Sequence, residues 1–207
     1  MLNTQIIDHP LAHHSLSILR DKHTDTEAFK RHAGIVSEIL IMEATKDLPI
    51  LYNDIETPLE TMIGKQVKNS LILVPVLRAG LSMLFSAREF VPWASVGFIG
   101  LERDEQTAQA REYYQKFPAQ LEDKLVLILD PMLATGGSLV DTLTSLHDKG
   151  AQQMRAVCVV AAPEGIDLVN EKFPDVHIFT CAVDSHLNDK KFIVPGLGDF
   201  GDRYFGT

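Results

Sequence analysis

Short apolar runs alternate with amphipathic segments along the last two thirds of the chain. The runs are rich in branched residues and too short for buried helices, so they predict strands at Leu71–Val76, Val96–Leu101, Leu125–Leu129, Ala156–Ala161 and Val176–Ala182. Helical patterns separate several of them, at Leu81–Phe90, Leu139–Lys149 (with Gly150 as the C-cap) and Ile166–Lys172. Continuously apolar strands alternating with helices predict an α/β fold, a parallel sheet with helices on both faces and right-handed crossovers.

A longer helix is predicted nearer the start, over residues 24–47. Thr24 and Glu27 have the spacing of a capping box. Apolar residues then recur at helical spacing, and further apolar positions widen the stripe: Phe29, Ala33, Val36, Leu40, Ile39, Ile41 and Met42. The wide stripe has two explanations, a contact between subunits or a thick core.

Two regions break the alternation of strands and helices. Residues 102–118 are polar and contain paired tyrosines, Tyr113 and Tyr114, which predicts a protruding arm or loop over the sheet edge. Residues 183–207 are rich in Gly and Asp, yet Ile193, Val194, Leu197, Phe200 and Phe205 could anchor them. We therefore expect one domain over residues 1–207, with an ordered C-terminal cap over a site.

Composition narrows the class of protein. With 207 residues and a charge of 19 − 28 = −9, the chain lacks the basic stripe that nucleic-acid backbones require, although a local pocket for a phosphate remains compatible with it. Two cysteines, Cys158 and Cys181, lie in apolar runs, so we expect them to be small buried apolar residues rather than redox or metal-binding groups. No secretory signal and no stretch of about 20 apolar residues is visible, so we expect a cytoplasmic protein without membrane contact.

The segment from Val126 to Ser138 carries the strongest chemical signal. A strand ends at Asp130, and a turn containing Thr135, Gly136 and Gly137 leads directly into a helix. Ligands of parallel sheets bind beyond the carboxyl ends of the strands, and a glycine turn at a helix N-terminus offers free amides to a phosphate. The carboxylate of Asp130 can accept hydrogen bonds from sugar hydroxyls. A tight strand–helix connection is the plainer alternative. The spacing matches neither a Walker A loop nor a dinucleotide fingerprint.

These residues also resemble a known family. The segment DPMLATGGS at 130–138 looks like the phosphoribosyl diphosphate (PRPP) loop of uracil phosphoribosyltransferases, of the type I phosphoribosyltransferases. Pro131 stands where the wider superfamily usually has a second acid, which narrows the resemblance to the uracil enzymes. It continues, in order, through HPL at 9–11, EATKDL at 43–48, LRAGL at 77–81, GLERD at 100–104, EYYQKFP at 112–118, VAAPEG at 160–165 and IVPGLGDFGDRYFGT at 193–207.

The resemblance implies transfer of ribose 5-phosphate from PRPP to uracil, giving UMP and diphosphate, with Mg²⁺ accompanying PRPP. It gives the catalytic roles to Asp130, Arg103 and Asp199. Two sequence departures, Glu102 and Ser82, bear on local geometry. The residues that it implies for PRPP are Arg78, Arg103, Asp130, Pro131, Met132, Leu133, Ala134, Thr135, Gly136, Gly137, Ser138 and Asp199.

The C-terminal tail is the predicted uracil site. Pro195, Gly196 and Gly198 let a main chain approach a flat ring, and a backbone edge can reject cytosine by leaving polar groups unpaired. The residues expected at uracil are Ile193, Gly198, Asp199 and Phe200. No direct protein metal site is expected, since Mg²⁺ would be held mainly through PRPP, with Asp199 as a candidate contact; His9, His13 and His14 lack further ligands.

Two other functions compete with uracil transfer. One is a PRPP- or nucleotide-sensing regulator that binds RNA on the same scaffold, which the acidic charge disfavours. The other is a transferase for a purine base. The resemblance also implies GTP as an allosteric activator in some members, and self-association as a dimer or tetramer. No residue pattern here identifies a GTP pocket or distinguishes between the two assemblies.

Overall fold

The protein is built on one large, mostly parallel sheet. The computed structural model describes residues 3–68, 71–103 and 110–207, without the side chains of residues 102, 103, 110 and 111. The sheet runs in the order β1-β11-β10-β8-β4-β6-β7, with β5 on β4 and β9 on β10, and only β7 is antiparallel to its neighbour. Its strands are β1 Thr4–Ile6, β4 Leu71–Leu77, β5 Ser95–Val96, β6 Phe98–Arg103, β7 Ala110–Lys116, β8 Leu125–Leu129, β9 Met132–Leu133, β10 Gln153–Ala161 and β11 His177–Val183.

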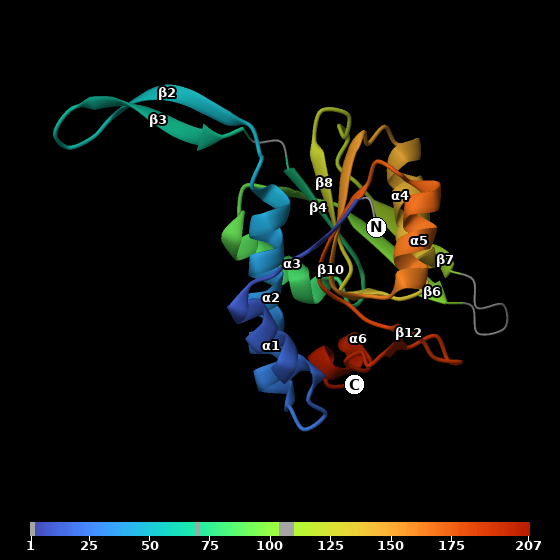
Figure 1. The fold of residues 1–207 in the computed structure, drawn as a ribbon. Coiled ribbons are helices and arrows are strands. Elements are labelled where there is room, and N and C mark those ends of the chain that lie inside the picture. Colours follow the sequence, from blue (N-terminus) through green and yellow to red (C-terminus); the bar gives the residue numbers. More distant parts are fainter. Residues whose placement is uncertain (1–2, 69–70, 104–109) are drawn as a thin grey trace.

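Helices cover both faces of this sheet, as predicted (Figure 1). One face carries α1 (Pro10–Arg20), α2 (Thr26–Thr45) and α3 (Leu81–Phe90), and the other carries α4 (Gly137–Asp148) and α5 (Pro163–Lys172). The tail forms β12 (His186–Leu187), β13 (Ile193–Val194) and α6 (Phe200–Phe205) beyond one end of the strands. The predicted α/β class is confirmed.

The continuous apolar runs fill two cores, one on each face. Successive strand residues point to opposite sides, so Leu71, Leu73, Leu127 and Leu129 join the core under α1–α3. Their even-numbered neighbours, such as Ile72 and Ile128, join the core under α4 and α5. A strand buried on both faces has no position for a polar residue, which explains why these runs were readable from the sequence.

Helix boundaries differ from the predictions by a few residues. The expected Thr24 capping box is wrong: Asp25 is the N-cap of α2, and its carboxylate accepts from the Ala28 amide at 2.8 Å. Thr24 instead donates its hydroxyl to the Ile18 carbonyl at 2.6 Å. Helix α5 begins earlier than predicted because Pro163 serves as its first residue.

The predicted polar arm at residues 102–118 is also wrong in part. Ala110–Lys116 forms β7, which pairs antiparallel with β6 in the main sheet; residues 104–109 lie outside the described part. The element that protrudes is a hairpin of β2 (Ile50–Glu56) and β3 (Thr61–Val67), which extends away from the body (Figure 1). Its mixed apolar and charged residues have no clear period, so it was not predicted.

The N-terminal segment has a structural role. His9 is the N-cap of α1, its ring accepting from the Leu11 amide at 3.2 Å, and Pro10 occupies the first helical turn. His13 contacts Asp8 at 2.9 Å. Within the described residues, no three His, Cys, Asp or Glu side chains form a metal-binding group.

The tail is anchored by apolar side chains, as expected for Ile193, Leu197 and Phe200, which are buried. The two cysteines are free and buried, and burial raises the pKa of the Cys181 thiol to about 12. Among helices in the described ranges, none has the length and apolar character needed to cross a membrane.

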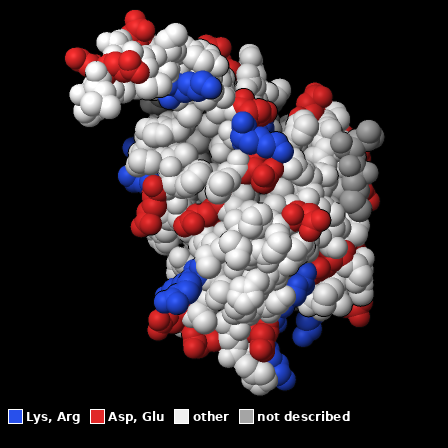
Figure 2. All heavy atoms as spheres, turned by 60° about the vertical axis from the view of Figure 1, so that its left-hand side comes forward, with Lys and Arg blue, Asp and Glu red and all other residues white. Residues whose placement is uncertain are grey.

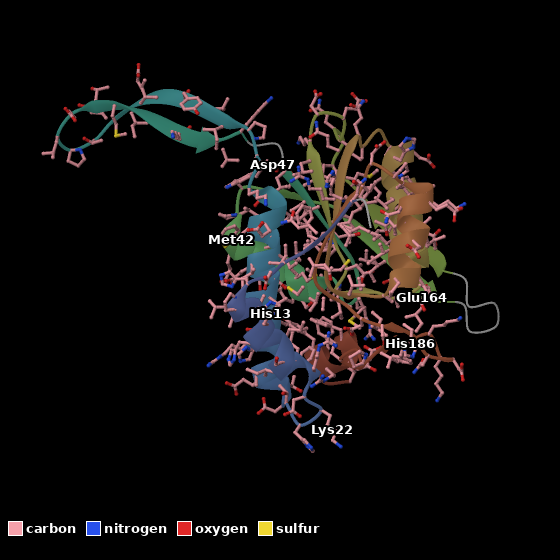
Figure 3. All side chains as sticks on the ribbon, in the orientation of Figure 1. His13, Lys22, Met42, Asp47, Glu164 and His186 are labelled. Atoms are coloured by element: carbon pink, nitrogen blue, oxygen red, sulfur yellow. The ribbon has the colours of Figure 1, made fainter. Side chains whose placement is uncertain are left out.

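Phe29 provides a test of how the tail is held. Its ring is fully buried on α2, meets the Phe200 ring at 5.0 Å between centroids, and lies 4.5 Å from the Arg203 guanidinium. We expect Phe29→Ala to lower the free energy of unfolding by about 3–5 kcal/mol, measured by urea denaturation. Met42→Ala on the exposed side of α2 is the control and should change it by less than about 0.5 kcal/mol (Figure 3). Equal effects would contradict the anchoring.

Candidate active site

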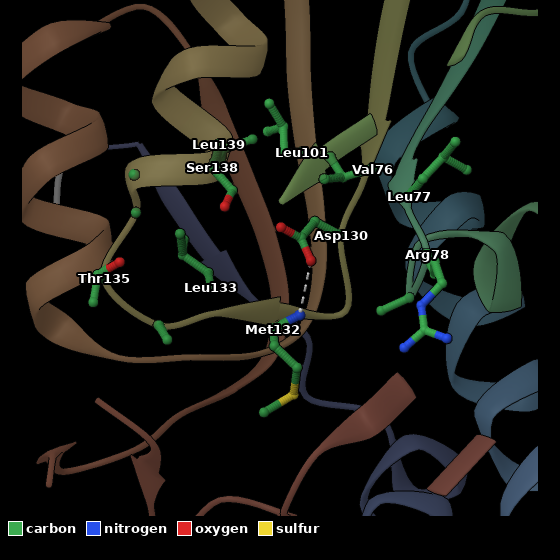
Figure 4. A pocket seen from close by; sticks show the side chains of 14 residues that line it. Val76, Leu77, Arg78, Leu101, Asp130, Met132, Leu133, Thr135, Ser138 and Leu139 are labelled. Carbon is green, nitrogen blue, oxygen red and sulfur yellow. Dashed lines mark hydrogen bonds between the residues drawn. The ribbon is translucent and has the colours of Figure 1, made fainter. Parts of the chain in front are cut away.

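Two neighbouring strands end together at the site. β4 and β8 are parallel and in register, with Pro75 opposite Leu129, so the segments that follow them emerge at the same edge. Arg78 follows β4 and Asp130 follows β8. Both side chains line a cavity of about 320 Å³ at this edge, shown in Figure 4. The predicted convergence of these two residues is confirmed.

The loop after β8 forms one wall of this cavity. β9 pairs with β10 and holds the start of the loop, and Gly136, with φ +85°, turns the chain into α4. Within the described part of the chain no side chain caps this helix N-terminus, which leaves the first amides of α4 available to a ligand beside the hydroxyls of Thr135 and Ser138. Negative groups are favoured here by the helix dipole as well.

The loop keeps its shape through close backbone packing on α5. A Cβ atom at Gly165 would lie 2.4 Å from the carbonyl oxygen of Ala134, and one at Gly136 would lie 2.8 Å from the carbonyl oxygen of Gly165. Larger residues at either position would push the loop away from the cavity. The VAAPEG segment at 160–165 therefore supports the loop from behind.

Arg78 is held by a similarly tight turn. A Cβ at Gly80 would lie 2.3 Å from the Leu129 carbonyl oxygen, so only glycine lets the turn after β4 pack against β8. The Leu77–Arg78 peptide bond is cis. Ser82, a departure from the family pattern, is buried and donates its hydroxyl to the Ala79 carbonyl at 2.7 Å, which is compatible with this turn. Among the described residues that line the cavity, Arg78 is the only Lys or Arg.

Asp130 is the acidic group of the cavity. Desolvation raises its pKa to about 6, and a long contact of 3.4 Å from the Met132 amide opposes this only weakly. The carboxylate therefore lacks strong partners of its own among the described residues, and hydroxyl donors of a ligand would satisfy it.

A second cavity of about 260 Å³ adjoins the first. All four residues expected at uracil line it: Ile193, Gly198, Asp199 and Phe200. It shares Ala79, Met132 and Ala134 with the first cavity, so molecules in the two cavities would lie against the same wall. Phe200 contributes backbone here, because its side chain is 1% exposed and belongs to the core.

The remaining predicted residues occupy different environments. Of residues 130–138, Pro131 does not line the first cavity; its carbonyl accepts from the Val159 amide at 2.9 Å and shapes the loop. Arg103 is the last residue of β6, and its side chain lies outside the described part. Asp199 is exposed and caps α6, accepting from the Asp202 amide at 2.9 Å through Oδ1.

Sequence reasoning missed part of the second cavity. Lys190, Lys191 and Phe192 line it from the turn between β12 and β13. Two adjacent lysines in a Gly- and Asp-rich tail were the available signal, because the tail was predicted to cover a site that also takes an anionic ligand.

Comparison with known proteins agrees with the sequence resemblance. The family model described as uracil phosphoribosyltransferase matches residues 6–207. A uracil phosphoribosyltransferase of Shouchella clausii is 47% identical over the full length of both chains, and one of Ligilactobacillus salivarius is 44% identical over 98% of each. Among solved structures, the AQ2163 protein of Aquifex aeolicus superposes with a TM-score of 0.93 at 38% identity, covering 99% of this chain and 98% of its own.

The raised pKa of Asp130 predicts how stability depends on pH. A carboxyl with a pKa of about 6 in the folded state and 3.8 in the unfolded state holds its proton more tightly when folded. The contribution of protonated Asp130 to the free energy of unfolding is therefore lost as the pH rises from about 4 to about 6, and it does not return at higher pH. Asp130→Asn should be more stable than the wild type by roughly 1–3 kcal/mol at pH 7.5 and equal at pH 4, by urea denaturation. The same difference at both pH values would refute this assignment.

Proposed function

The chain belongs to the uracil phosphoribosyltransferase family, and from this premise we propose that the first cavity binds PRPP and the second binds uracil. The family reaction converts uracil and PRPP to UMP and diphosphate. The observation that carries the assignment is the shared wall of Ala79, Met132 and Ala134. It would bring the nitrogen of a base in one cavity close to the sugar carbon of a donor in the other.

The loop 134–138 receives the 5′-phosphate in this proposal. Its support is the uncapped N-terminus of α4, with amides and two hydroxyls directed at one cavity. Asp130 accepts from the ribose 2′- and 3′-hydroxyls. A carboxylate is suited to this position beside the sugar, whereas directly against the phosphate it would be repelled.

The diphosphate leaves from the side of Arg78. As the bond from C1 to the diphosphate oxygen breaks, both electrons go to the leaving group and the sugar gains oxocarbenium character. Guanidinium groups placed at that end stabilise the developing charge. Arg78 supplies one, and we assign the same role to Arg103 on the family pattern. The bond from N1 of uracil to C1 then forms, and N1 loses its proton to water.

Uracil is recognised by the backbone of residues 193–200. Gly198 has φ +80°, a conformation that glycine adopts without strain, and it is exposed in the cavity. Amides there would pair with the O4 acceptor of uracil. Cytosine carries an amino donor at that position, so two donors would face each other and the wrong base would be rejected.

Mg²⁺ accompanies PRPP in this family, and the residues present fit such a mode. Mg²⁺ commonly binds through one or two carboxylates, substrate phosphates and water. The described residues offer single carboxylates, Asp130 in the first cavity and Asp199 in the second, rather than a dedicated group of ligands, and Asp199 uses only Oδ1 in capping α6. When bound, the ion would supply charge neutralisation for the diphosphate.

The two competing hypotheses, an RNA-binding regulator and a purine transferase, receive less support. The match over residues 6–207 and the relatives named for uracil favour transfer to uracil over an RNA-binding regulator or a purine enzyme. Figure 2 shows acidic and basic groups interspersed on the face that it presents, with no continuous basic patch. A cytoplasmic location and activation by GTP remain our predictions, the second testable by adding GTP to the assay below.

We also propose that the chain forms a homo-oligomer through the β2–β3 hairpin. A two-stranded hairpin on its own is only marginally stable in water. In this hairpin the apolar side chains of Tyr52, Leu59 and Ile63 are 65%, 94% and 64% exposed. Exposed apolar groups in such a projection favour a protein partner. A second copy of the chain would supply one without any other molecule. A contact between subunits through the helix predicted over residues 24–47 is an alternative to contact through the hairpin.

The purified chain tests the function directly. Incubated with PRPP, Mg²⁺ and each free base in turn, it should form UMP from uracil and no nucleotide from cytosine, adenine, guanine or hypoxanthine, by chromatography of the products. Asp130→Asn should lower kcat/KM by about 10²-fold, the scale of one lost charged contact. Nucleotide formation from a purine at a comparable rate would overturn the assignment.

The hairpin proposal is tested by sedimentation velocity. Charges placed on the exposed apolar residues would have to be desolvated in an interface, so Tyr52→Asp combined with Ile63→Asp should reduce the mass to that of a monomer. Leu11→Asp, at another exposed apolar position on α1, is the control and should sediment like the wild type. A doubly substituted chain that keeps the wild-type mass would exclude the hairpin as the contact.

A further inference from the structure

An ion pair outside both cavities binds the turn at Gly196, which lies between two segments that line the second cavity. Arg20 is the last residue of α1, and Asp184 follows β11. Their contact is bidentate, with Nη2 to Oδ1 at 2.6 Å and Nη1 to Oδ2 at 2.8 Å. Asp184 is only 8% exposed, which makes the pair much less screened by water than a surface contact.

Both charged groups also bind the main chain of Gly196. Arg20 Nη1 donates to the Gly196 carbonyl at 2.7 Å, and the Gly196 amide donates to Asp184 Oδ2 at 2.8 Å. The peptide groups on both sides of this glycine are thus fixed by opposite charges. Gly196 has φ +60°, and a Cβ there would lie 2.1 Å from the Ile193 carbonyl oxygen, so no other residue fits the turn.

This turn connects two segments of the second cavity. Ile193 lies three residues before Gly196 and Gly198 lies two residues after it, and both line the cavity, whereas Arg20 and Asp184 line neither cavity of the site. The Asp184 amide donates to the Ala161 carbonyl at 2.8 Å, which ties the pair to the end of β10. The main sheet thereby sets where the turn sits.

A neighbouring arginine fixes the other side of the same turn. Arg203 on α6 donates Nη1 to the carbonyls of Leu197 and Leu19, the first at 2.7 Å, and Nη2 to the Asp21 carbonyl at 2.6 Å. Residues 196 and 197 are therefore both tied to the end of α1. Figure 3 shows Lys22, just past that end, and His186 in the tail at the same end of the molecule.

We infer that the Arg20–Asp184 ion pair is a positioning device for base recognition, holding the backbone edge that reads uracil in its productive orientation. The inference rests on the proposed location of uracil in the second cavity. Neither residue lines the cavities proposed for the two substrates. Because the PRPP loop is supported separately, through Gly165, loosening the turn should weaken the use of uracil and leave the use of PRPP unchanged.

Steady-state kinetics of the full chain test this. Asp184→Asn retains the shape of the side chain but removes its charge, so we expect the KM for uracil to rise by at least about tenfold, with the KM for PRPP within about twofold of the wild type. Arg20→Lys keeps the charge but cannot bridge Asp184 and Gly196 as a fork, and should give a smaller shift in the same direction.

The chain offers a control pair of the same bidentate geometry at the opposite end of the molecule. Arg155 binds Asp47 in the same bidentate way, at 2.6 and 2.7 Å, and also donates to the Ala44 carbonyl at 2.6 Å. Figure 3 labels Asp47 at the end remote from Lys22 and His186. The Asp47 side chain is 61% exposed, so Asp47→Asn should lower thermal stability less than Asp184→Asn does, and it should leave both KM values unchanged.

The outcomes separate this inference from the assignment of the cavity. Gly198→Val, assayed in parallel, should raise the KM for uracil; if it does not, the proposed uracil site itself is wrong. If Gly198→Val has that effect but Asp184→Asn changes neither KM, or changes both equally, or matches Asp47→Asn, the positioning role is wrong. Should Asp184→Asn fail to fold by circular dichroism, the shift in Arg20→Lys decides by the same criteria.

Discussion

The close approach of two backbones determines the geometry of this site. The Ala134 carbonyl lies where only a glycine at position 165 leaves room for it, and Gly136 depends in turn on the Gly165 carbonyl. This packing fixes the start of α4 and therefore the direction of its unpaired amides. Side chains can adjust by rotation, whereas a backbone contact of this kind permits one arrangement. The anionic ligand that we propose for this loop would thus meet donors whose orientation is already fixed, which is the condition for efficient stabilisation of charge.

The main sheet was predictable because its strands are buried on both faces. Runs such as Leu125–Leu129 contain no polar residue, and their alternating side chains supply two separate cores. The β2–β3 hairpin was not predictable, since no internal core imposes a period on residues such as Tyr52 and Ile63. The segment that forms β7 was taken for an arm because an exposed edge strand is polar, and only its pairing with β6 identifies it.

The site was predictable to the extent that local sequence determines it. The glycine turn at 135–138 places its own donors, and β4 and β8 bring Arg78 and Asp130 to one edge through sheet register. Contacts between distant segments were not accessible in this way. Nothing near Asp184 in the sequence indicates that Arg20, 164 residues away, will bind it. Phe200 was predicted to anchor the tail, but nothing in the sequence identifies Phe29 as its partner. Such pairs depend on the finished fold.

The wall shared by the two cavities has a consequence for inhibitor design. Ala79, Met132 and Ala134 line both cavities, of about 320 and 260 Å³, which we propose to bind an anionic sugar donor and a flat base. A single compound that joins a phosphate mimic to a pyrimidine mimic would lose translational freedom once, whereas two fragments lose it twice. Its linker would cross small side chains and one flexible thioether, which tolerate variation in length. On the proposed assignment of the two cavities, the shared wall therefore favours a bisubstrate analogue over two separate fragments.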